Sequence, residues 1–442
     1  MSQPEPKRTF ERSNDLQERA RSLIPGGSHT YAKGADQYPV HAPGVLLRGK
    51  GCRVWDADGN EFIEYGMGCR AVSLGHAFAP VCDAVAKSLS LGTNFTRPAA
   101  MELECAEKII GLVRGAEMVK FTKDGSAATT AALKIARAAT GRDLIAFCSD
   151  HPYFASNDWF IGKTKCNAGI PEAVSELSLT FRFNDLASVE ALFAKYPNQI
   201  AAIILEPSRG EDPKDNFLHR VQELCRIDGA LFILDEMITG FRWDTGGAQQ
   251  TYDIVPDLSC FGKAMANGFS VSALLGKREF MELGGLDHLK PRVFLLSTTH
   301  GGEIPMLAAA IATMDFYQAN PVIERLHDAG KRLRLGVNEK IEAHGLEDNI
   351  QIMGRDCNLV FTCKDQNLQP CQAFRSLLIQ ELIQNGILAP SFVVSYSHTD
   401  ADIDQTVEAM GRAMAVYARA LDDGVDQHLI GRPSKVVMRT YN

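Results

Sequence analysis

From about residue 116 the chain alternates short apolar runs with longer segments in which apolar residues recur every three or four positions. Short apolar runs are typical of strands buried on both faces, and the longer period is typical of amphipathic helices. The pattern predicts strands at residues 117–122, 143–149, 199–207, 230–236, 258–263, 271–277 and 293–298. Helical patterns between them include SAATTAALKIARAAT, LASVEALFAKY and FLHRVQELCRIDG. This alternation indicates an α/β fold in which helices flank a parallel sheet.

The two ends of the chain show a different pattern. The first 75 residues predict a helix and then extended pieces, in which the turn DADGN separates two alternating runs like a hairpin. From about residue 321, long amphipathic helices mix with short strand-like runs such as NLVFTCK and PSFVVS. We therefore expect a large domain over residues 76–320. A smaller α+β domain would be built from residues 1–75 and 321–442.

Composition is that of a large globular protein without a nucleic-acid surface. The 442 residues are 45% hydrophobic and 23% charged, which is enough for a large buried core and for two domains. The formal net charge is −8, and no Lys/Arg run is dense enough to bind nucleic acid. The first residues lack the apolar stretch of a secretory signal, and no window is apolar enough for a membrane span. We expect a cytoplasmic protein that binds neither nucleic acid nor membranes.

Eleven cysteines are scattered along the chain, several of them inside apolar runs such as LSCFG and AFCSD. No pair or His/Cys cluster has the spacing of zinc ligands. The cysteines are therefore predicted to be buried free thiols, and no metal site is expected.

The segment LFILDEMITGFR, at 231–242, is an apolar run that ends in Asp235 and Glu236. An acid at the end of a buried strand suits either the magnesium of a bound nucleotide or the ring nitrogen of an organic cofactor. The nucleotide interpretation also requires a Gly-x4-Gly-Lys-Ser/Thr loop. The nearest approach is FIGKTK, where Asn157 stands in place of the first glycine. This absence favours the organic cofactor.

A pyridine cofactor would need an anion-binding helix start, an aromatic face, an acid and a lysine. In FTKDGSAATTAALKIAR a strand, a turn with Gly125 and Ser126, and a helix follow one another, so backbone N–H groups would face a phosphate. An ordinary helix cap is the other interpretation of such a turn. Lys263, in CFGKAMANG, follows an apolar run, and a desolvated lysine amine is a nucleophile toward an aldehyde. Asp235 would keep the pyridine nitrogen protonated.

Ordered motifs extend this pattern over nearly the whole chain: RSLIPGG, VWDADGNEFIEY, SLGHAF, DGSAATTAALKIARAATGR, ILEPSRGE, LDEMITGFR, FGKAMANGF, STTHGGE and SHTDADIDQTVEAM. With them the sequence resembles the class III (omega) aminotransferases among the fold-type I pyridoxal-phosphate enzymes. It is most similar to their glutamate-1-semialdehyde aminomutase branch. The resemblance implies a large domain with a mostly parallel seven-stranded sheet and a small α+β domain from both termini.

The resemblance assigns the central cofactor contacts. It implies that Lys263 is the Schiff-base lysine, which holds pyridoxal phosphate as an internal aldimine and later moves a proton. Asp235 would be the partner of the pyridine nitrogen, and Gly125 with Ser126 would form the phosphate turn.

Further positions are implied by the same motifs. Tyr153 falls where the family stacks an aromatic residue on the cofactor ring, although Phe154 and Ala155 replace the His-Gly that follows there. Met237 would pack on the opposite ring face. Thr299 would reach the phosphate of the neighbouring subunit, with Thr298 as the alternative in a shifted alignment, so a homodimer with shared active sites is expected.

The same motifs offer candidates for the substrate side of the site. Glu206 and Glu211 have family counterparts near the cofactor and substrate, and a structural ion pair, for instance with Arg209 or Arg242, is the alternative for either. Arg242 would help to organise the acids of the pocket. In the aminomutases an arginine follows IPGG and takes the substrate carboxylate, but here Tyr31 stands at that position. A tyrosine hydroxyl cannot form the bidentate charged pair that arginine makes with a carboxylate. Arg70 is a candidate replacement anchor for a carboxylate or phosphate, and a surface or interdomain arginine is the alternative.

The sequence therefore predicts a pyridoxal-phosphate-dependent aminotransferase. It would move an amino group between an amino donor and a small carbonyl compound, which is a keto acid, an amino-acid semialdehyde or a keto-sugar. Intramolecular transfer by a 2,1-aminomutase, racemisation, and cofactor binding without turnover remain alternatives. The missing carboxylate arginine ranks transamination above the aminomutase.

Overall fold

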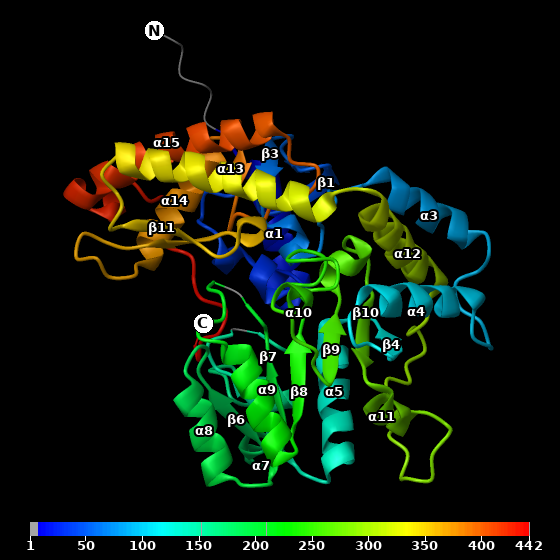
Figure 1. The fold of residues 1–442 in the computed structure, drawn as a ribbon. Helices are drawn as coiled ribbons and strands as arrows, with labels where there is room; N and C mark the ends of the chain where they lie inside the picture. The colour runs from blue at the N-terminus through cyan, green and yellow to red at the C-terminus, as the bar shows by residue number, and fades with distance from the viewer. Residues whose placement is uncertain (1–7, 152, 209, 442) are drawn as a thin grey trace. The chain divides into compact units, whose positions relative to one another are not determined.

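A computed structural model describes residues 8–151, 153–208 and 210–441, and its chain divides into two compact units (Figure 1). The large unit comprises Ala71–Ser73, Ala79–Ile323 and the residues from Met438 onward. The small unit comprises the described residues 8–70, with Leu74–Phe78 and Glu324–Val437.

The large unit contains a seven-stranded sheet in the order β4-β10-β9-β8-β7-β5-β6. Its strands are β4 Met118–Thr122, β5 Leu144–Cys148, β6 Ser178–Phe181, β7 Ile200–Leu205, β8 Leu231–Asp235, β9 Leu258–Phe261 and β10 Ser272–Gly276. Neighbours from β6 to β9 are parallel, whereas β10 is antiparallel to both β4 and β9. The predicted mostly parallel sheet of the fold-type I enzymes is therefore confirmed.

One predicted strand of this sheet is wrong. Residues 293–298 form no strand, because Leu296 has a φ of 47° and this left-handed conformation turns the chain out of an extended path. The seventh strand is β6, a segment of only four residues that the apolar pattern did not reveal. In the small unit the run PSFVVS is likewise no strand and makes a single bridge between Phe392 and Leu359.

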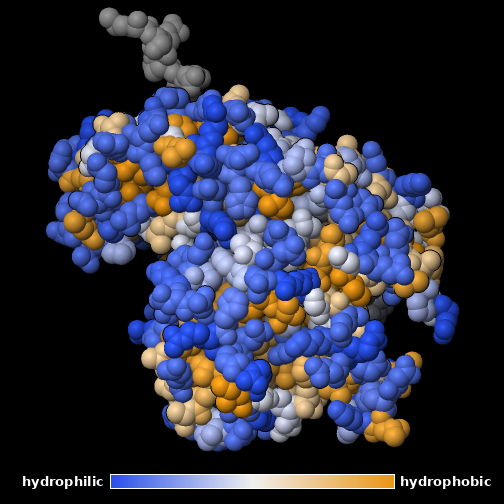
Figure 2. Space-filling model, viewed as in Figure 1, coloured by the Kyte–Doolittle hydropathy of each residue, from blue (hydrophilic) through white to orange (hydrophobic). Residues whose placement is uncertain are grey.

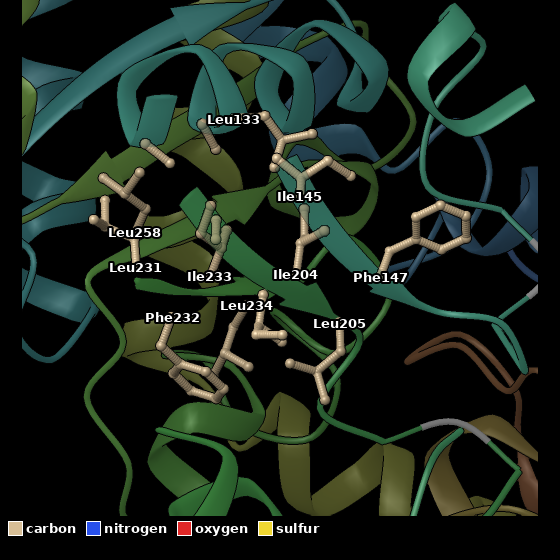
Figure 3. Packing of buried hydrophobic residues seen from close by; sticks show 14 of the residues in the cluster. Leu133, Ile145, Phe147, Ile204, Leu205, Leu231, Phe232, Ile233, Leu234 and Leu258 are labelled. Atoms are coloured by element: carbon tan, nitrogen blue, oxygen red, sulfur yellow. The ribbon is translucent and has the colours of Figure 1, made fainter. Parts of the chain in front are cut away.

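The core explains the continuous apolar runs of the sequence. Strands β7 and β8 are buried at every position. Successive side chains of β8, such as Ile233 and Leu234, project to opposite faces of the sheet (Figure 3). Helix α5 (Gly125–Thr140) packs on β4, β7, β9 and β10, and helix α9 (Phe217–Asp228) packs on β8. Both helices end at a left-handed glycine, Gly141 after α5 and Gly229 after α9.

The other helices of the large unit are α3 Ala79–Leu89, α4 Ala100–Leu112, α6 Asp158–Ile161, α7 Glu172–Glu176, α8 Leu186–Lys195, α10 Ala248–Thr251, α11 Arg278–Met281 and α12 Ile304–Ala319. Across the described residues, no helix has the length and apolarity needed to cross a membrane. On the face seen in Figure 2, hydrophilic residues are interspersed with hydrophobic ones.

The small unit is an α+β structure made from both ends of the chain, as predicted. Strands β1 Leu46–Lys50, β2 Arg53–Asp56, β3 Glu61–Glu64 and β13 Ile387–Leu388 form one sheet, and β11 Ile350–Met353 pairs with β12 Val360–Cys363. The DADGN turn joins β2 and β3 as an antiparallel hairpin. The helices of this unit are α1 Glu11–Leu23, α2 Met67–Arg70, α14 Gln372–Gln384 and α15 Asp400–Asp423, and it also holds α13 Val322–Ala343 from Glu324 onward.

Candidate functional site

A cavity of about 270 Å³ lies in the large unit, beyond the carboxyl ends of the central strands. Asp235 ends β8, Glu206 follows β7, and Lys263 comes two positions after β9. All three line the cavity, together with Lys123, Asp124, Gly125, Ser126, Tyr153, Phe154, Met237 and Phe269, Ser270, Val271, Ser272. Ligands of open α/β sheets gather at this edge because parallel strands bring their carboxyl ends together there.

The start of α5 forms one wall of the cavity. Asp124 caps this helix by accepting a hydrogen bond from the Ala127 N–H at 2.9 Å. The first turn of a helix presents backbone N–H groups and the positive end of its dipole, both of which favour an anion. Gly125 and Ser126 begin this turn, so their surroundings suit an anion.

The hydroxyl of Ser126 also organises the aromatic wall. It lies 3.3 Å from the Tyr153 hydroxyl and accepts a hydrogen bond from the Ser156 N–H at 2.9 Å. The Tyr153 ring packs edge-on against Phe160, with centroids 5.8 Å apart, and its side chain is 48% exposed. An aromatic face is thus available beside the start of α5.

Met237 occupies a slot between two glycines. A Cβ atom on Gly125 would lie 2.9 Å from the Met237 sulfur, and one on Gly262 would lie 2.7 Å from it. Side chains at either position would push Met237 from its place. The sulfur therefore lies close to both Gly125 and Gly262, the residue that precedes Lys263.

Asp235 is only 3% exposed, and its Oδ1 accepts a hydrogen bond from the Met237 N–H at 3.0 Å. Burial, and after it the charge of Glu206, raises the pKa of Asp235 to about 7, while Lys263 acts in the opposite direction. A buried carboxylate of this kind is stabilised by a cation placed against it. The protonated ring nitrogen of a pyridine is such a cation, so the site suits that group.

Lys263 begins a 3-10 turn, Lys263–Ala266, and its own φ is 45°. Left-handed backbone is strained for a residue with a Cβ, and such strain is concentrated at functional sites. The strained turn carries the lysine into the cavity wall, where its charge acts on Asp235.

Glu236, the second acid of the pair, has a structural environment. Its completely buried carboxylate accepts hydrogen bonds from the Ala248 N–H at 2.8 Å, the Gln249 N–H at 2.7 Å and the Thr239 hydroxyl. Burial raises the pKa of Glu236 to about 7. Glu236 therefore fixes the loop that leaves β8, whereas Asp235 lines the cavity.

Other predicted site residues of the large unit, all within the described part of the chain, do not line this cavity. Glu211 is exposed and forms an ion pair with Lys214 at 2.6 Å. Arg242 is completely buried and is not part of the cavity wall. Thr299 is exposed, and its carbonyl accepts a hydrogen bond from the Asn94 amide at 2.8 Å. Neither Thr299 nor Thr298 lines this cavity, and the roles of all these residues stay predictions.

The two predicted substrate residues of the small unit have distinct surroundings within it. Tyr31 is 67% exposed, and its ring closes the space beside Gly26. The Arg70 guanidinium donates to the Asn358 side-chain oxygen at 2.9 Å and to the Ser391 hydroxyl at 3.4 Å. Their roles toward a substrate also stay predictions.

Sequence reasoning missed part of the cavity wall, namely Lys123 and the segment 269–272. Lys123 is paired with Glu303 at 2.5 Å, and its carbonyl accepts a hydrogen bond from the Ser270 hydroxyl at 2.7 Å. The one signal in the sequence was that Lys123 lies two positions before Gly125, in the predicted phosphate turn. Nothing in FSVS marks Ser270 or Ser272, because their position depends on β10 running antiparallel between β4 and β9.

The class-III aminotransferase family model matches residues 34–414 of this chain. The chain belongs to the class-III aminotransferases. Glutamate-1-semialdehyde 2,1-aminomutase from Thermomicrobium roseum is 34% identical to it over 438 residues, which cover 93% of this chain and 99% of the relative. The enzyme of the same name from Desulforamulus reducens is 32% identical over 435 residues, with 93% and 99% covered. The resemblance to the aminomutase branch is confirmed.

Solved structures of this family share the fold. The FumI protein of Sphingopyxis sp. MTA144, in its PLP internal aldimine form, is 28% identical with a TM-score of 0.84, and the comparison covers 93% of this chain and 98% of that one. An omega-transaminase from Sphaerobacter thermophilus is 27% identical, also with a TM-score of 0.84, and 92% and 98% are covered. This class-III enzyme is accordingly a pyridoxal-phosphate-dependent aminotransferase or aminomutase that acts on small molecules.

Proposed function

We propose that this class-III enzyme is an aminotransferase that works in two half-reactions, of the kind called ping-pong. An amino donor would leave its amino group on the enzyme, and a small carbonyl compound would then take that group up. The acceptor would be a keto acid, an amino-acid semialdehyde or a keto-sugar. The convergence of Lys263, Asp235 and Glu206 on one cavity beside the start of α5 carries the proposal.

The residues of the cavity fit pyridoxal phosphate. Gly125 and Ser126 at the start of α5 would hold its phosphate. Tyr153 and Met237 would contact the two faces of its ring, and the buried Asp235 would pair with the ring nitrogen. When bound, the cofactor supplies an aldehyde that forms Schiff bases with amines and a ring that withdraws electrons.

Lys263 would carry out the proton transfers of the reaction. Its Nζ would hold the cofactor covalently at rest and, once displaced by the donor, would accept the proton from the amino-bearing carbon of the donor. In the second half-reaction the same amine would deliver a proton to the carbonyl carbon of the acceptor. Asp235 would keep a negative charge beside the ring nitrogen. Burial and then the charge of Glu206 raise the pKa of Asp235, so Glu206 would affect how readily Asp235 stays ionised.

The 2,1-aminomutase is the second candidate, and the 34% identity to an aminomutase over 93% of the chain favours it. Transamination ranks first because Tyr31 stands where the aminomutases have their carboxylate arginine. Arg70, Glu211 and Arg242 complete the proposed substrate side with Tyr31. An acceptor with a hydroxylated chain would suit a tyrosine hydroxyl, whereas a simple dicarboxylate would need a cation such as Arg70.

The active assembly that we propose is a cytoplasmic homodimer in which Thr299, or Thr298, reaches the phosphate bound in the neighbouring subunit. Mixing and refolding two inactive variants, Lys263→Ala and Thr299→Val, tests it. Each hybrid dimer would contain one site with an intact Lys263 and an intact Thr299, so activity should return on mixing. Activity that stays absent from mixed dimers, while each variant alone lacks it, would remove Thr299 from the partner's site. The pair Lys263→Ala and Thr298→Val tests the alternative.

The reaction is tested with a panel of carbonyl acceptors offered to the enzyme in its amino form, while the cofactor spectrum is followed. The purified protein should be yellow, and Lys263→Ala should lose the covalent link to the cofactor. An acceptor that restores the yellow form identifies the transaminase. Conversion of glutamate semialdehyde to 5-aminolevulinate without a second substrate would establish the aminomutase instead. Loss of optical activity in an amino compound without an acceptor would indicate a racemase.

A further inference from the structure

His151 lies just beyond the carboxyl end of β5 and is not itself part of the cavity wall. It follows β5, which pairs in parallel with β7 so that Phe147 lies opposite Ile204. The side chain is 3% exposed. Its Nδ1 accepts a hydrogen bond from the backbone N–H of Glu206 at 3.1 Å. The imidazole therefore joins the ends of two neighbouring strands.

This hydrogen bond holds the residue that carries a cavity carboxylate. Glu206 comes directly after Leu205, the last residue of β7, and its side chain lines the cavity beside Asp235. A buried N–H beyond the end of a strand needs an acceptor from outside the sheet ladder. His151 supplies that acceptor and so fixes the backbone from which the Glu206 carboxylate projects.

The His151 ring also packs against Phe154, a second residue of the cavity wall, and against Phe183. Its centroid lies 5.7 Å from that of Phe154 and 5.2 Å from that of Phe183. Phe154 lines the cavity, and its carbonyl accepts a hydrogen bond from the Thr129 hydroxyl of α5 at 3.2 Å. The imidazole is thus packed by rings and oriented so that Nδ1 faces Glu206.

We propose that His151 is a positioning residue for amino transfer, whose neutral imidazole holds Glu206 in the orientation that places its carboxylate beside Asp235. The inference rests on the proposed function, because that function gives Glu206 and Asp235 their roles toward the cofactor. Nδ1 accepts a hydrogen bond only when it carries no proton, so the ring proton resides on Nε2. His151 itself stays outside the cavity wall, which distinguishes it from the residues that touch the cofactor.

Nitrogen-15 NMR of histidine-labelled protein, before and after removal of the cofactor, tests the hydrogen bond directly. The His151 signals, assigned by their loss in His151→Asn, should show a protonated Nε2 and an unprotonated Nδ1 in both forms. A proton on Nδ1 would overturn the proposal. This measurement needs no turnover, so it separates failure of the His151 assignment from failure of the proposed reaction.

Three variants test the consequence for the site. His151→Phe keeps a ring between Phe154 and Phe183 but removes the acceptor. It should lower kcat at least tenfold, change KM less than threefold, and shift the absorption maximum of the bound cofactor. His151→Asn keeps an acceptor near the Nδ1 position and should restore kcat to within about threefold of the parent value. His219→Phe, at an exposed histidine of α9, is the matched control.

The comparison between the variants decides the outcome. Equal losses in the Phe and Asn variants, or a parental kcat and spectrum in His151→Phe, would show that the acceptor is not what positions the site. If His151→Phe fails to fold, the kcat of His151→Asn and the protonation state of His151 in the parent protein, seen by NMR, still test whether the acceptor at His151 positions the site.

Discussion

Met237 fits closely against Gly125, the first residue of α5, because Gly125 has no side chain. A Cβ atom at this position would lie 2.9 Å from the Met237 sulfur. This contact brings the proposed phosphate turn and the proposed ring contact into one wall. We therefore expect Gly125→Ala to displace Met237 and to weaken cofactor binding about tenfold or more. Titration of the cofactor-free protein with pyridoxal phosphate, followed by absorbance, measures the change.

Gly111→Ala is the control for this substitution. Gly111 lies inside α4, and a Cβ atom there would meet no atom within 4 Å. The control should leave cofactor affinity unchanged and stabilise the helix by up to about 1 kcal/mol. An unchanged affinity in Gly125→Ala would show that Met237 is free to move without loss of the site.

Asp235→Asn should separate activity from stability. The substitution removes the charge proposed to face the ring nitrogen, so kcat should fall by a factor of about 100 or more. It also removes a buried carboxyl whose pKa is raised from 3.8 to about 7, chiefly by burial and then by Glu206. Stopped-flow or steady-state kinetics measure the first effect, and thermal unfolding of the cofactor-free protein measures the second.

The pH dependence of that stability has a definite sign. Between about pH 4 and pH 7 the folded, cofactor-free protein keeps a proton on Asp235 that the unfolded chain has released. Its stability should therefore fall as the pH rises through this range. Asp235→Asn should be more stable than the parent protein at pH 8, by about 1–3 kcal/mol, and similar to it at pH 4. A parent protein that gains stability over this interval relative to the variant would contradict the raised pKa.

Glu236→Ala should lower the free energy of unfolding, because the role of Glu236 is structural. The carboxylate satisfies the Ala248 and Gln249 N–H groups, and its loss would leave buried donors without an acceptor. The expected cost is about 2–4 kcal/mol in the free energy of unfolding. Glu236→Gln retains one acceptor oxygen and should cost less. Urea unfolding of both variants gives the comparison, and equal midpoints for parent and Glu236→Ala would exclude the structural role.

Cys69→Gly should stabilise the small unit. Residues Met67–Arg70 all have positive φ, and Cys69 itself is at φ 58° and ψ 43°, in the left-handed region. A residue with a Cβ is strained there, so glycine should add about 0.5–1 kcal/mol after its greater freedom in the unfolded chain is counted. Cys82→Gly, inside helix α3, should instead destabilise by about 1 kcal/mol. Thermal unfolding midpoints that move in the same direction for both substitutions would refute this explanation.

Local patterns were sufficient for the central strands and for the helices that join them. Strands β7 and β8 are buried on both faces, so their apolar runs are continuous and easily recognised. Residues 293–298, VFLLST, also begin with an apolar run, yet the left-handed backbone at Leu296 prevents a strand. The four residues of β6 were missed for the converse reason, since their place at the sheet edge follows from pairing with β5 rather than from their own pattern.

By itself the sequence determined which residue types supply the chemistry and in which order they follow along the chain. They are a helix start after β4, an acid at the end of an apolar run, and a lysine after the next apolar run. These features are local, because each depends on a strand and the turn that follows it. Only the tertiary structure decided which other side chains complete the cavity. Ser272 enters through an antiparallel strand, and His151 reaches Glu206 because β5 and β7 are neighbours in the sheet. Such contacts join residues far apart in the chain, and strand order, which no local pattern encodes, brings them together.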